Sequence, residues 1–345
     1  MNKLNLLKNK RVLVTGGGGF LGWAVVQKLL EKGALVRSFS RRSYPQLAAA
    51  GVDQVQGDIS DPEAVAAACR GIDTVYHVAA KAGVWGRASD FHRTNVVGTR
   101  NVIGACRAGS VEALVYTSSP SVVFDGKDME GVDESVPYPD RYPTPYPQTK
   151  ALAEREVVMA ARSGLKTIVL RPHLIWGPGD NHLVPRIIGR ARHLRRVGDG
   201  RNLVDTVYID NAADAHILAA EFLETRPELS GQIYFISQGE PIPLWEMINA
   251  ILAAAGLPPV RKSISLRTAR RLGAVMEILY RFLRLENEPP MTRFVAEELA
   301  TSHWFDIGAA RRDLGYRPAV STSEGLRRLA RWLDPSRNKE SKLET

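Results

Sequence analysis

The segment PYPQTK places a tyrosine and a lysine four residues apart, at Tyr146 and Lys150. Four residues are about one helical turn, so both side chains would face one side of a helix that we expect to begin at Pro147. A free tyrosine has a pKa near ~10, too high for efficient proton exchange at neutral pH. A positive charge about 4 Å away stabilises the phenolate by on the order of 4 kcal/mol. We therefore expect Lys150 to lower the pKa of Tyr146.

Two further tyrosines, Tyr138 and Tyr142, belong to the same proline-rich segment, VPYPDRYPTPYPQTK. Each is followed four residues later by another tyrosine and not by a cation. Only Tyr146 therefore has the partner that proton transfer needs. The alternative for this spacing is a tyrosine packed at an interface, because the same pattern also arises by chance.

Two serines, Ser118 and Ser119, follow the apolar run ALVYT, which we predict to be a buried strand. Ligands of parallel sheets bind at the carboxyl ends of the strands. Ser119 is therefore a candidate to hydrogen-bond a substrate oxygen beside Tyr146, with Ser118 in support. The alternative is a pair of ordinary hydroxyls at the end of a strand.

A glycine string, TGGGGFLG, lies between a predicted strand and a predicted helix, with Gly16, Gly19 and Gly22 in the spacing GxxGxxG. The first glycine permits a tight turn, the second lets backbone amides approach a pyrophosphate, and the third lets helix and strand pack closely. The amides at the start of the helix then attract the anion. This arrangement predicts a dinucleotide site.

The end of the second predicted strand, VRSFSRRS, indicates which dinucleotide binds. An acidic residue there would bond the ribose 2′-hydroxyl of NAD, whereas an arginine pairs with the 2′-phosphate of NADP. The stretch has no acid, and Arg41 and Arg42, assisted by Ser40, favour NADPH/NADP as the cofactor. The alternative is a pair of surface arginines. Asp58 could bond the adenine or cap a turn.

Short apolar runs alternate with longer helical patterns from residue 11 onward, which is typical of βαβ units. The sequence therefore predicts an α/β protein with a Rossmann-type doubly wound parallel sheet and a smaller, mostly helical substrate domain. We expect residues 1–180 to form the NADP-binding domain, with 204–237 returning to it through a strand-like TVYIDNAADAHILAAEFL. Residues 181–203 and 238–345 would form the substrate-binding domain.

The charge and cysteine content restrict the partners. The chain of 345 residues has 46 basic and 37 acidic groups. Residues 1–180 hold 22 basic and 17 acidic groups, and the remainder holds 24 and 20, so the excess is spread out and we expect no nucleic-acid partner. Two cysteines in helical stretches argue against a structural disulfide and favour the cytoplasm. We see no signal peptide, spanning helix or metal-ligand pattern.

Together these motifs resemble the extended short-chain dehydrogenase/reductase family over about residues 11–333. The matching segments are TGGGGFLG, GDI, HVAAKAG, NVVGT, YTSS, YPQTK, LRPHLIWGPGD and VYIDNAADAH. The resemblance implies Tyr146 as the acid and base, Lys150 as its electrostatic partner, Ser119 as the oxygen-binding hydroxyl and Asn95 as the holder of a relay water. It further implies a cofactor-binding set of Gly16, Gly19, Phe20, Leu21, Gly22, Arg41, Arg42, Asp58, Ile59, Ala79, Ala80, Lys81, Ser118, Tyr146, Lys150, Pro172 and Ile175.

Within that family the chain is most similar to the branch that acts on 3-hydroxysteroids and long-chain 3-oxo acids. Segments such as AAKAGVWG and NEPPMTRFVAEELATSHWF resemble the 2-alkyl-3-oxoalkanoate reductases of bacterial long-chain olefin synthesis, whereas VVFDGKD and GDGRNLVD resemble sterol 4-carboxylate 3-dehydrogenases. The resemblance implies an apolar β-keto or β-hydroxy acid substrate, a homodimer and assembly with other enzymes of the olefin pathway. The alternatives are a decarboxylating sterol-4-carboxylate 3-dehydrogenase or a 3-beta-hydroxysteroid dehydrogenase, a nucleotide-sugar epimerase or dehydratase, and a non-catalytic NADPH-binding scaffold.

Residues 272–285, LGAVMEILYRFLRL, are apolar over most of a helix but include Glu277, Arg281 and Arg284. This helix could wall a pocket for alkyl chains, or make a peripheral contact with a membrane beside its basic neighbours. The alternative is an ordinary core helix. We expect the substrate carboxylate to pair with an arginine from the cluster between residues 186 and 201.

Overall fold

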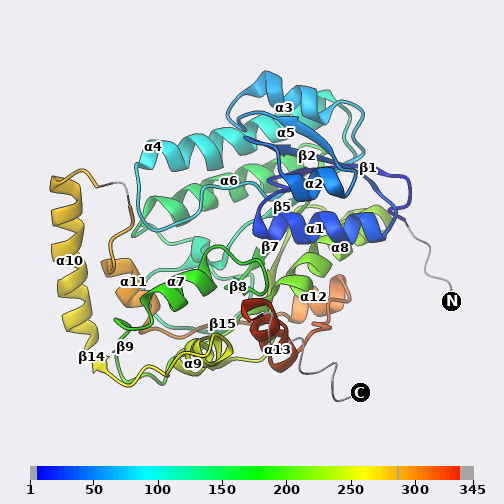
Figure 1. Ribbon diagram of the computed structural model, residues 1–345. Coiled ribbons are helices and arrows are strands. Elements are labelled where there is room, and N and C mark those ends of the chain that lie inside the picture. The colour runs from blue at the N-terminus through cyan, green and yellow to red at the C-terminus, as the bar shows by residue number, and fades with distance from the viewer. Residues whose placement is uncertain (1–5, 286, 335–345) are drawn as a thin grey trace, which may run out of the picture.

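A single parallel sheet organises the molecule. The structure is a computed structural model that describes residues 6–285 and 287–334 (Figure 1). Seven strands, all parallel, lie in the order β12-β7-β5-β4-β1-β2-β3. From edge to edge they are β12 (Gln232–Ile236), β7 (Lys166–Pro172), β5 (Ala113–Thr117), β4 (Thr74–His77), β1 (Arg11–Thr15), β2 (Leu35–Ser40) and β3 (Asp53–Gln56).

Helices cover both faces of this sheet, which is why its central strands are almost continuously apolar. One face packs against α1 (Phe20–Glu31) and α8 (Ile209–Thr225). The other packs against α3 (Pro62–Cys69), α5 (Gly98–Ala108) and α6 (Pro145–Arg162). The short α2 (Pro45–Ala49) precedes β3. The predicted doubly wound α/β fold is confirmed.

One stretch differs from the sequence prediction. Residues 206–223 were expected to be strand-like, but only β11 (Val207–Tyr208) is extended, and α8 begins immediately afterwards at Ile209. The small side chains of Ala212, Ala215 and Ala219 are buried against neighbouring elements, which lets this helix approach the sheet closely. The β-branched and aromatic residues before it had suggested a longer strand.

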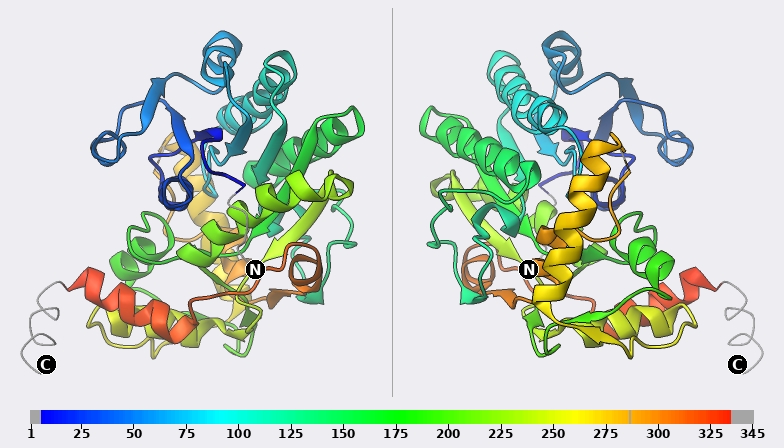
Figure 2. Two further views of the ribbon diagram at one scale, coloured as in Figure 1. Left: turned by 90° about the vertical axis from the view of Figure 1, so that its right-hand side faces the viewer. Right: turned by 90° about the vertical axis from the view of Figure 1, so that its left-hand side faces the viewer.

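The later part of the chain builds a second layer below the carboxyl ends of the strands (Figures 1 and 2). A mixed sheet of four strands, in the order β13-β10-β15-β6, lies within it. These strands are β6 (Met129–Val132), β10 (Leu203–Val204), β13 (Ile242–Pro243) and β15 (His303–Phe305). The helices of this layer are α7 (Leu183–Arg190), α9 (Leu244–Ala254), α10 (Leu266–Phe282), α11 (Arg293–Glu298), α12 (Gly308–Asp313) and α13 (Thr322–Leu333).

Short elements complete the fold. The pairs β8 (Ile175–Trp176) with β11, and β9 (Arg196–Val197) with β14 (Ser263–Ile264), are both parallel. Between β4 and α5 the chain forms α4 (Ala88–Phe91) and a π-helix (His92–Val97), and one-turn 3₁₀ helices occupy Pro120–Val123 and Pro227–Leu229. Cys69 and Cys106 are buried free thiols. Among the described residues, no helix combines the length and apolar character needed to cross a bilayer.

Candidate active site

Tyr146 lies in the first turn of α6, close to the carboxyl end of β5. The helix begins at Pro145 after the extended residue Thr144, so the predicted start at Pro147 is wrong by two residues. The physical reason is that both prolines fit the first turn, where the amides that they lack would have no helical acceptor. Tyr146 is half-buried at this helix start.

Ser119 contacts the candidate acid directly. It ends the extended chain after β5, and its hydroxyl oxygen accepts hydrogen bonds from the Ser121 amide (3.2 Å) and hydroxyl (3.0 Å). Its own hydrogen is then free for donation, and its hydrogen bond to Tyr146 lowers the pKa of that phenol. Burial is the larger effect and raises the pKa of Tyr146 above its ordinary value. The predicted lowering of the Tyr146 pKa is therefore wrong for the cofactor-free protein.

The position of Lys150 explains why the pKa of Tyr146 is not lowered, because the lysine amine is hydrogen-bonded to another part of the protein. Only 2% of the residue is exposed, and Nζ donates to the Thr117 carbonyl at 2.5 Å while lying 4.2 Å from the centre of the Tyr116 ring. Burial lowers the pKa of Lys150 to about 7, although the nearby Glu154 opposes this shift. The lysine is thus only partly charged at neutral pH, and its amine is hydrogen-bonded to strand β5.

The other two tyrosines of the proline-rich segment have structural contacts. Tyr138 donates to Glu154 at 2.6 Å, and this buried carboxylate also pairs with Arg171 at 2.6 Å. Tyr142 donates to the Val122 carbonyl at 3.1 Å. Both phenols are therefore committed to protein acceptors, which leaves Tyr146 as the one beside Ser119.

Asn95 is buried in the π-helix, where its side-chain amide forms hydrogen bonds to the backbone at Lys81 and to helix α6. The Asn95 oxygen accepts from the Lys81 amide at 2.7 Å, and its nitrogen donates to the Lys81 carbonyl and to the Thr149 hydroxyl, both at 3.0 Å. Thr149 follows Tyr146 within the first turns of α6. The side chain thus positions the backbone at Lys81 relative to the helix that holds Tyr146.

A buried chain of hydroxyl and imidazole groups supports the same region. Thr99 donates its proton to the Asn95 carbonyl at 2.6 Å, so the His77 Nε2 that contacts it at 3.0 Å must be the donor. His77 Nδ1 then accepts from Thr15 at 2.8 Å, and Thr15 accepts from the Ala79 amide at 3.1 Å. Burial lowers the pKa of His77 to about 3, which keeps this chain neutral.

The glycine loop has the geometry that a pyrophosphate requires. Gly16 has a φ of +72°, and a Cβ at Gly22 would overlap the Gly16 carbonyl oxygen. No side chain caps the start of α1 at Gly19, so the amides of the first turn, which includes Phe20 and Leu21, face the loop without a side-chain acceptor. The helix start can therefore bind an anion.

A tyrosine that sequence reasoning missed lies against this loop. Arg42 donates to the Tyr44 hydroxyl at 3.3 Å, and its guanidinium lies 5.2 Å from the centre of that ring. The Tyr44 ring covers Gly18 so closely that a Cβ there would overlap it. Both arginines are exposed, but the contact with Tyr44 places Arg42 beside the loop. The charge of Arg41 helps to lower the pKa of Asp58.

The remaining predicted cofactor residues follow the carboxyl ends of the strands. Asp58 accepts from the Ser60 amide (2.9 Å) and hydroxyl (2.7 Å), which lowers its pKa and agrees with the turn-capping alternative. Ile59 is buried against Gly98, and Ala80 is exposed next to Ala79.

Ser118 and the end of β7 complete the predicted cofactor set. The Ser118 hydroxyl is buried and has no hydrogen-bond partner among the described residues, which makes it available to a ligand. Its amide donates to the Leu170 carbonyl at 2.6 Å in β7. Pro172 ends that strand, and Ile175 pairs with Val207 in the short sheet next to it.

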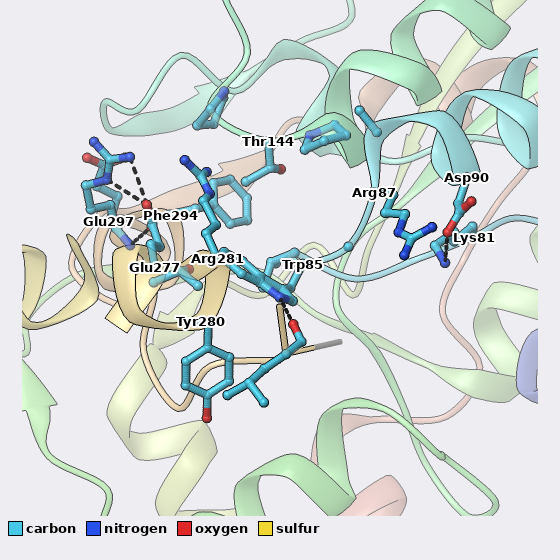
Figure 3. Close-up of a pocket in the computed structure, with 18 of the residues that line it drawn as sticks. Lys81, Trp85, Arg87, Asp90, Thr144, Glu277, Tyr280, Arg281, Phe294 and Glu297 are labelled. Carbon is cyan, nitrogen blue, oxygen red and sulfur yellow. Dashed lines mark hydrogen bonds and ion pairs between the residues drawn. The ribbon is translucent and has the colours of Figure 1, made fainter. Parts of the chain in front are cut away.

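A cleft of about 910 Å³ opens beside the start of α6 (Figure 3). Its walls come from the 81–90 loop, residues 143–145 and helices α10 and α11. Six basic side chains and three acidic ones line it, together with aromatic and aliphatic groups. The charged ones are Lys81, Arg87, Arg270, Arg281, Arg284, Arg293, Asp90, Glu277 and Glu297, and the apolar ones include Val84, Trp85, Tyr280, Leu285 and Phe294.

The arginines of the cleft are not those that the sequence indicated. Arg186 and Arg190 of the expected cluster pair with Glu288 at 2.6 and 3.5 Å, and no member of that cluster lines the cleft. Sequence reasoning did not assign Trp85, whose indole donates to the Leu285 carbonyl at 3.1 Å and lies under Arg281. In the sequence, only the apolar helix pattern of residues 272–285 indicated that this segment could form a wall of the cleft.

Comparisons with known proteins show which family and fold the chain is similar to. The sequence profile of the 3-beta hydroxysteroid dehydrogenase/isomerase family matches residues 13–267. A 2-alkyl-3-oxoalkanoate reductase of Stenotrophomonas maltophilia is 53% identical over 92% of this chain and 98% of its own. The protein of that name from Shewanella oneidensis is 49% identical over 93% and 86%. The solved structure of MoeE5 in complex with UDP-glucose and NAD is 26% identical, with a TM-score of 0.72 over 94% of this chain and 99% of that one.

Proposed function

Because the chain belongs to the 3-beta hydroxysteroid dehydrogenase/isomerase family, a branch of the extended short-chain dehydrogenases/reductases, we propose that this oxidoreductase reduces a 2-alkyl-3-oxoalkanoic acid to the 2-alkyl-3-hydroxyalkanoic acid with NADPH. The observation that carries the substrate assignment is the pair of reductases, 53% and 49% identical, that align with more than nine-tenths of the chain. We place the reaction in long-chain olefin biosynthesis and regard it as reversible. Sterol dehydrogenation is the alternative.

The protonation state of Tyr146 fits the reductive direction. Burial raises its pKa, so the phenol keeps its proton at neutral pH and can deliver it to the oxygen of a carbonyl that accepts a hydride. When bound, NADPH would supply that hydride. Ser119 already donates to the same phenol, and we propose that it donates to the substrate oxygen during the reaction. Lys150 holds the adjacent strand end and adds positive charge when protonated.

The residues around the glycine loop fit a nicotinamide dinucleotide. The absent Cβ at Gly22 lets the loop pack tightly against the start of α1, whose first turn has no side-chain cap. Together with the unpartnered Ser118 hydroxyl, this loop is compatible with a polar ligand along the strand ends. We propose NADPH over NADH because β2 ends without an acid and Arg42 is held beside the loop by Tyr44. A guanidinium in this position can pair with a 2′-phosphate.

The cleft beside α6 fits an amphipathic acid. Its six basic and three acidic side chains leave an excess of positive charge that favours a carboxylate, while Trp85, Tyr280 and Phe294 offer apolar contacts to alkyl chains. We further propose that residues 1–180 and 204–237 form the cofactor-binding domain, and that 181–203 and 238–345 form the substrate-binding domain. Parts of the first and last ranges lie outside the described residues. Of the second domain, residues between 270 and 297 line the cleft, together with residues 81–90 and 143–145 of the first. We expect a cytoplasmic homodimer that works beside other pathway enzymes.

One assay tests this proposal directly. The purified chain is incubated with NADP⁺ or NAD⁺ and, separately, with 2-alkyl-3-hydroxy fatty acids, 3-hydroxysterols and UDP-sugars, while reduced nicotinamide is followed by absorbance. We expect a signal with the 2-alkyl-3-hydroxy acids that is stronger with NADP⁺. Turnover of the sterols alone would support the alternative function, and turnover of UDP-sugars alone would refute both.

A further inference from the structure

Helix α10 exposes an apolar stripe to solvent. Figures 1 and 2 show this helix at the rim of the molecule, with one side facing outward. Seven of the eleven large hydrophobic residues that are exposed in the described chain lie between residues 272 and 285. Val275, Ile278 and Phe282 are 63%, 68% and 83% exposed, and they recur every three or four residues along one helix face. A stripe of this kind marks an interaction surface.

The other side of α10 is fixed to the protein. Gly273 packs so closely against residues 292 and 293 that a Cβ would overlap their backbone. Glu277 is buried, accepts from the Arg293 amide at 2.7 Å and pairs with the Arg293 guanidinium at 2.8 Å. The helix is therefore anchored to α11 by its inner side, and the apolar stripe is a stable feature of the surface.

Positive charge accompanies the stripe. Residues 261–285 contain seven basic side chains and one acidic one, Glu277, whose charge is already paired with Arg293. Arg267 and Arg271 precede Val275 at helical spacing, so they extend the exposed face toward the start of α10. An apolar stripe bordered by arginines is the pattern of helices that lie in the interface of a membrane with anionic lipids.

The same helix forms a wall of the cleft. Tyr280 and Arg281 line the cleft (Figure 3). Ile278 and Phe282, on the same helix, belong to the exposed stripe. The apolar stripe and the cleft are therefore separated only by the thickness of one helix. A surface bound through this stripe would lie next to the cleft, where an apolar ligand could enter without crossing bulk water.

We propose that the outer face of α10, formed by Arg267, Arg271, Leu272, Val275, Ile278, Leu279 and Phe282, docks on an anionic lipid membrane. Charge complementarity favours this occupant over a second copy of the chain, because two such faces would bring like charges together. The helix lies parallel to the bilayer plane, with its apolar side chains in the headgroup region. This docking does not depend on which substrate the cleft accepts.

The proposal is tested with the full chain and sucrose-loaded lipid vesicles in a sedimentation assay. We expect binding to vesicles of phosphatidylcholine and phosphatidylglycerol in a ratio of two to one, weak binding to phosphatidylcholine alone, and release by high salt. Replacing both arginines, Arg267→Gln with Arg271→Gln, should weaken binding about thirty-fold, since each arginine near an anionic surface contributes about fivefold. Val275→Ser with Phe282→Ser should weaken it at least as much.

Matched controls come from other surfaces of the chain. Arg107→Gln with Arg317→Gln removes two exposed arginines elsewhere, and Met159→Ser removes an apolar side chain that is 52% exposed on α6. Both should bind anionic vesicles as the parent chain does. The proposal is refuted if the parent chain does not bind these vesicles, or if the α10 and control variants bind equally. It is also refuted if Val275→Ser with Phe282→Ser converts a dimer to a monomer in ultracentrifugation while leaving vesicle binding unchanged.

Discussion

Replacing Lys150 by methionine should change how the stability of the protein depends on pH. The folded chain holds the pKa of Lys150 at about 7, compared with the ordinary value of 10.5, because the amine is desolvated. Between these two pH values the unfolded chain binds a proton that the folded chain does not. The free energy of unfolding therefore rises with pH through this window. Methionine has a similar length but no titrating group, so Lys150→Met should lose this contribution.

The magnitude follows from the two pKa values. Each difference of one pKa unit corresponds to about 1.4 kcal/mol between the protonation states. For a single group with the pKa values given above, the linkage amounts to about 2 kcal/mol between pH 7 and pH 9. The free energy of unfolding of the parent chain should thus rise by about 2 kcal/mol more than that of Lys150→Met over this interval.

Urea unfolding of the cofactor-free protein at pH 7, 8 and 9, followed by circular dichroism, gives the required free energies. Subtracting the free energy of unfolding of the variant from that of the parent removes the contribution of every group that titrates equally in both. Lys127→Met serves as the control, because Lys127 is exposed on the surface and should leave the pH dependence unchanged. Parallel pH profiles for the parent and Lys150→Met would refute the inferred desolvation of this lysine.

Three further substitutions test the other parts of the site. Gly22→Ala should remove NADPH binding, measured by nucleotide fluorescence, because its Cβ would overlap the Gly16 carbonyl; binding of normal strength would contradict the loop geometry. Arg42→Ala should raise the Kd for NADPH about tenfold and leave that for NADH unchanged, and an equal effect on both would contradict a 2′-phosphate contact. Arg171→Met should lower the free energy of unfolding in urea by about 3–5 kcal/mol, since it leaves the buried Glu154 carboxylate without its cation. A decrease of less than about 1 kcal/mol in the free energy of unfolding would contradict the expected cost of leaving the buried Glu154 carboxylate without a cation.

The parallel sheet and its glycine loop could be predicted from sequence because they depend on local patterns. Apolar runs of strand length alternate with helical ones, and Gly16, Gly19 and Gly22 have a spacing whose steric reason is local. The start of α6 was missed by two residues because two prolines in the first turn offer equally good starts. The length of β11 was overestimated because Val207 and Tyr208 favour strands and α8 follows with no cap signal.

The side-chain contacts of the candidate site could not be predicted, because they depend on tertiary packing. The spacing of Tyr146 and Lys150 suggested that the lysine charge lowers the pKa of the tyrosine. The lysine amine instead donates a hydrogen bond to the Thr117 carbonyl of the adjacent strand. In the same way, the sequence did not indicate that the Asn95 side-chain amide bonds to Lys81 and Thr149, and the assignment of this residue to a relay water stays a prediction. Residues far apart in sequence supply these partners, and no periodic pattern indicates them.

The cleft arginines illustrate the same limit. A cluster between residues 186 and 201 attracted attention by its density, but Arg186 and Arg190 are paired with Glu288. The cleft is lined instead by Arg281 near the end of α10 and by Arg284 just beyond it, which the sequence showed as interruptions of an apolar helix. Charge density along the chain indicates little about which cations face a cavity, because ion pairs form across the fold.

The most direct test of the account is the turnover of Tyr146→Phe compared with Tyr142→Phe. Both variants remove one phenolic hydroxyl from the same segment, but only the first removes the hydroxyl beside Ser119. With NADP⁺ and a 2-alkyl-3-hydroxy fatty acid, kcat of Tyr146→Phe should fall by roughly 10²–10⁴-fold while the Kd for NADPH stays within about twofold. Tyr142→Phe should remain close to the parent chain. Near-normal turnover by Tyr146→Phe would contradict the assignment of this phenol as the proton donor.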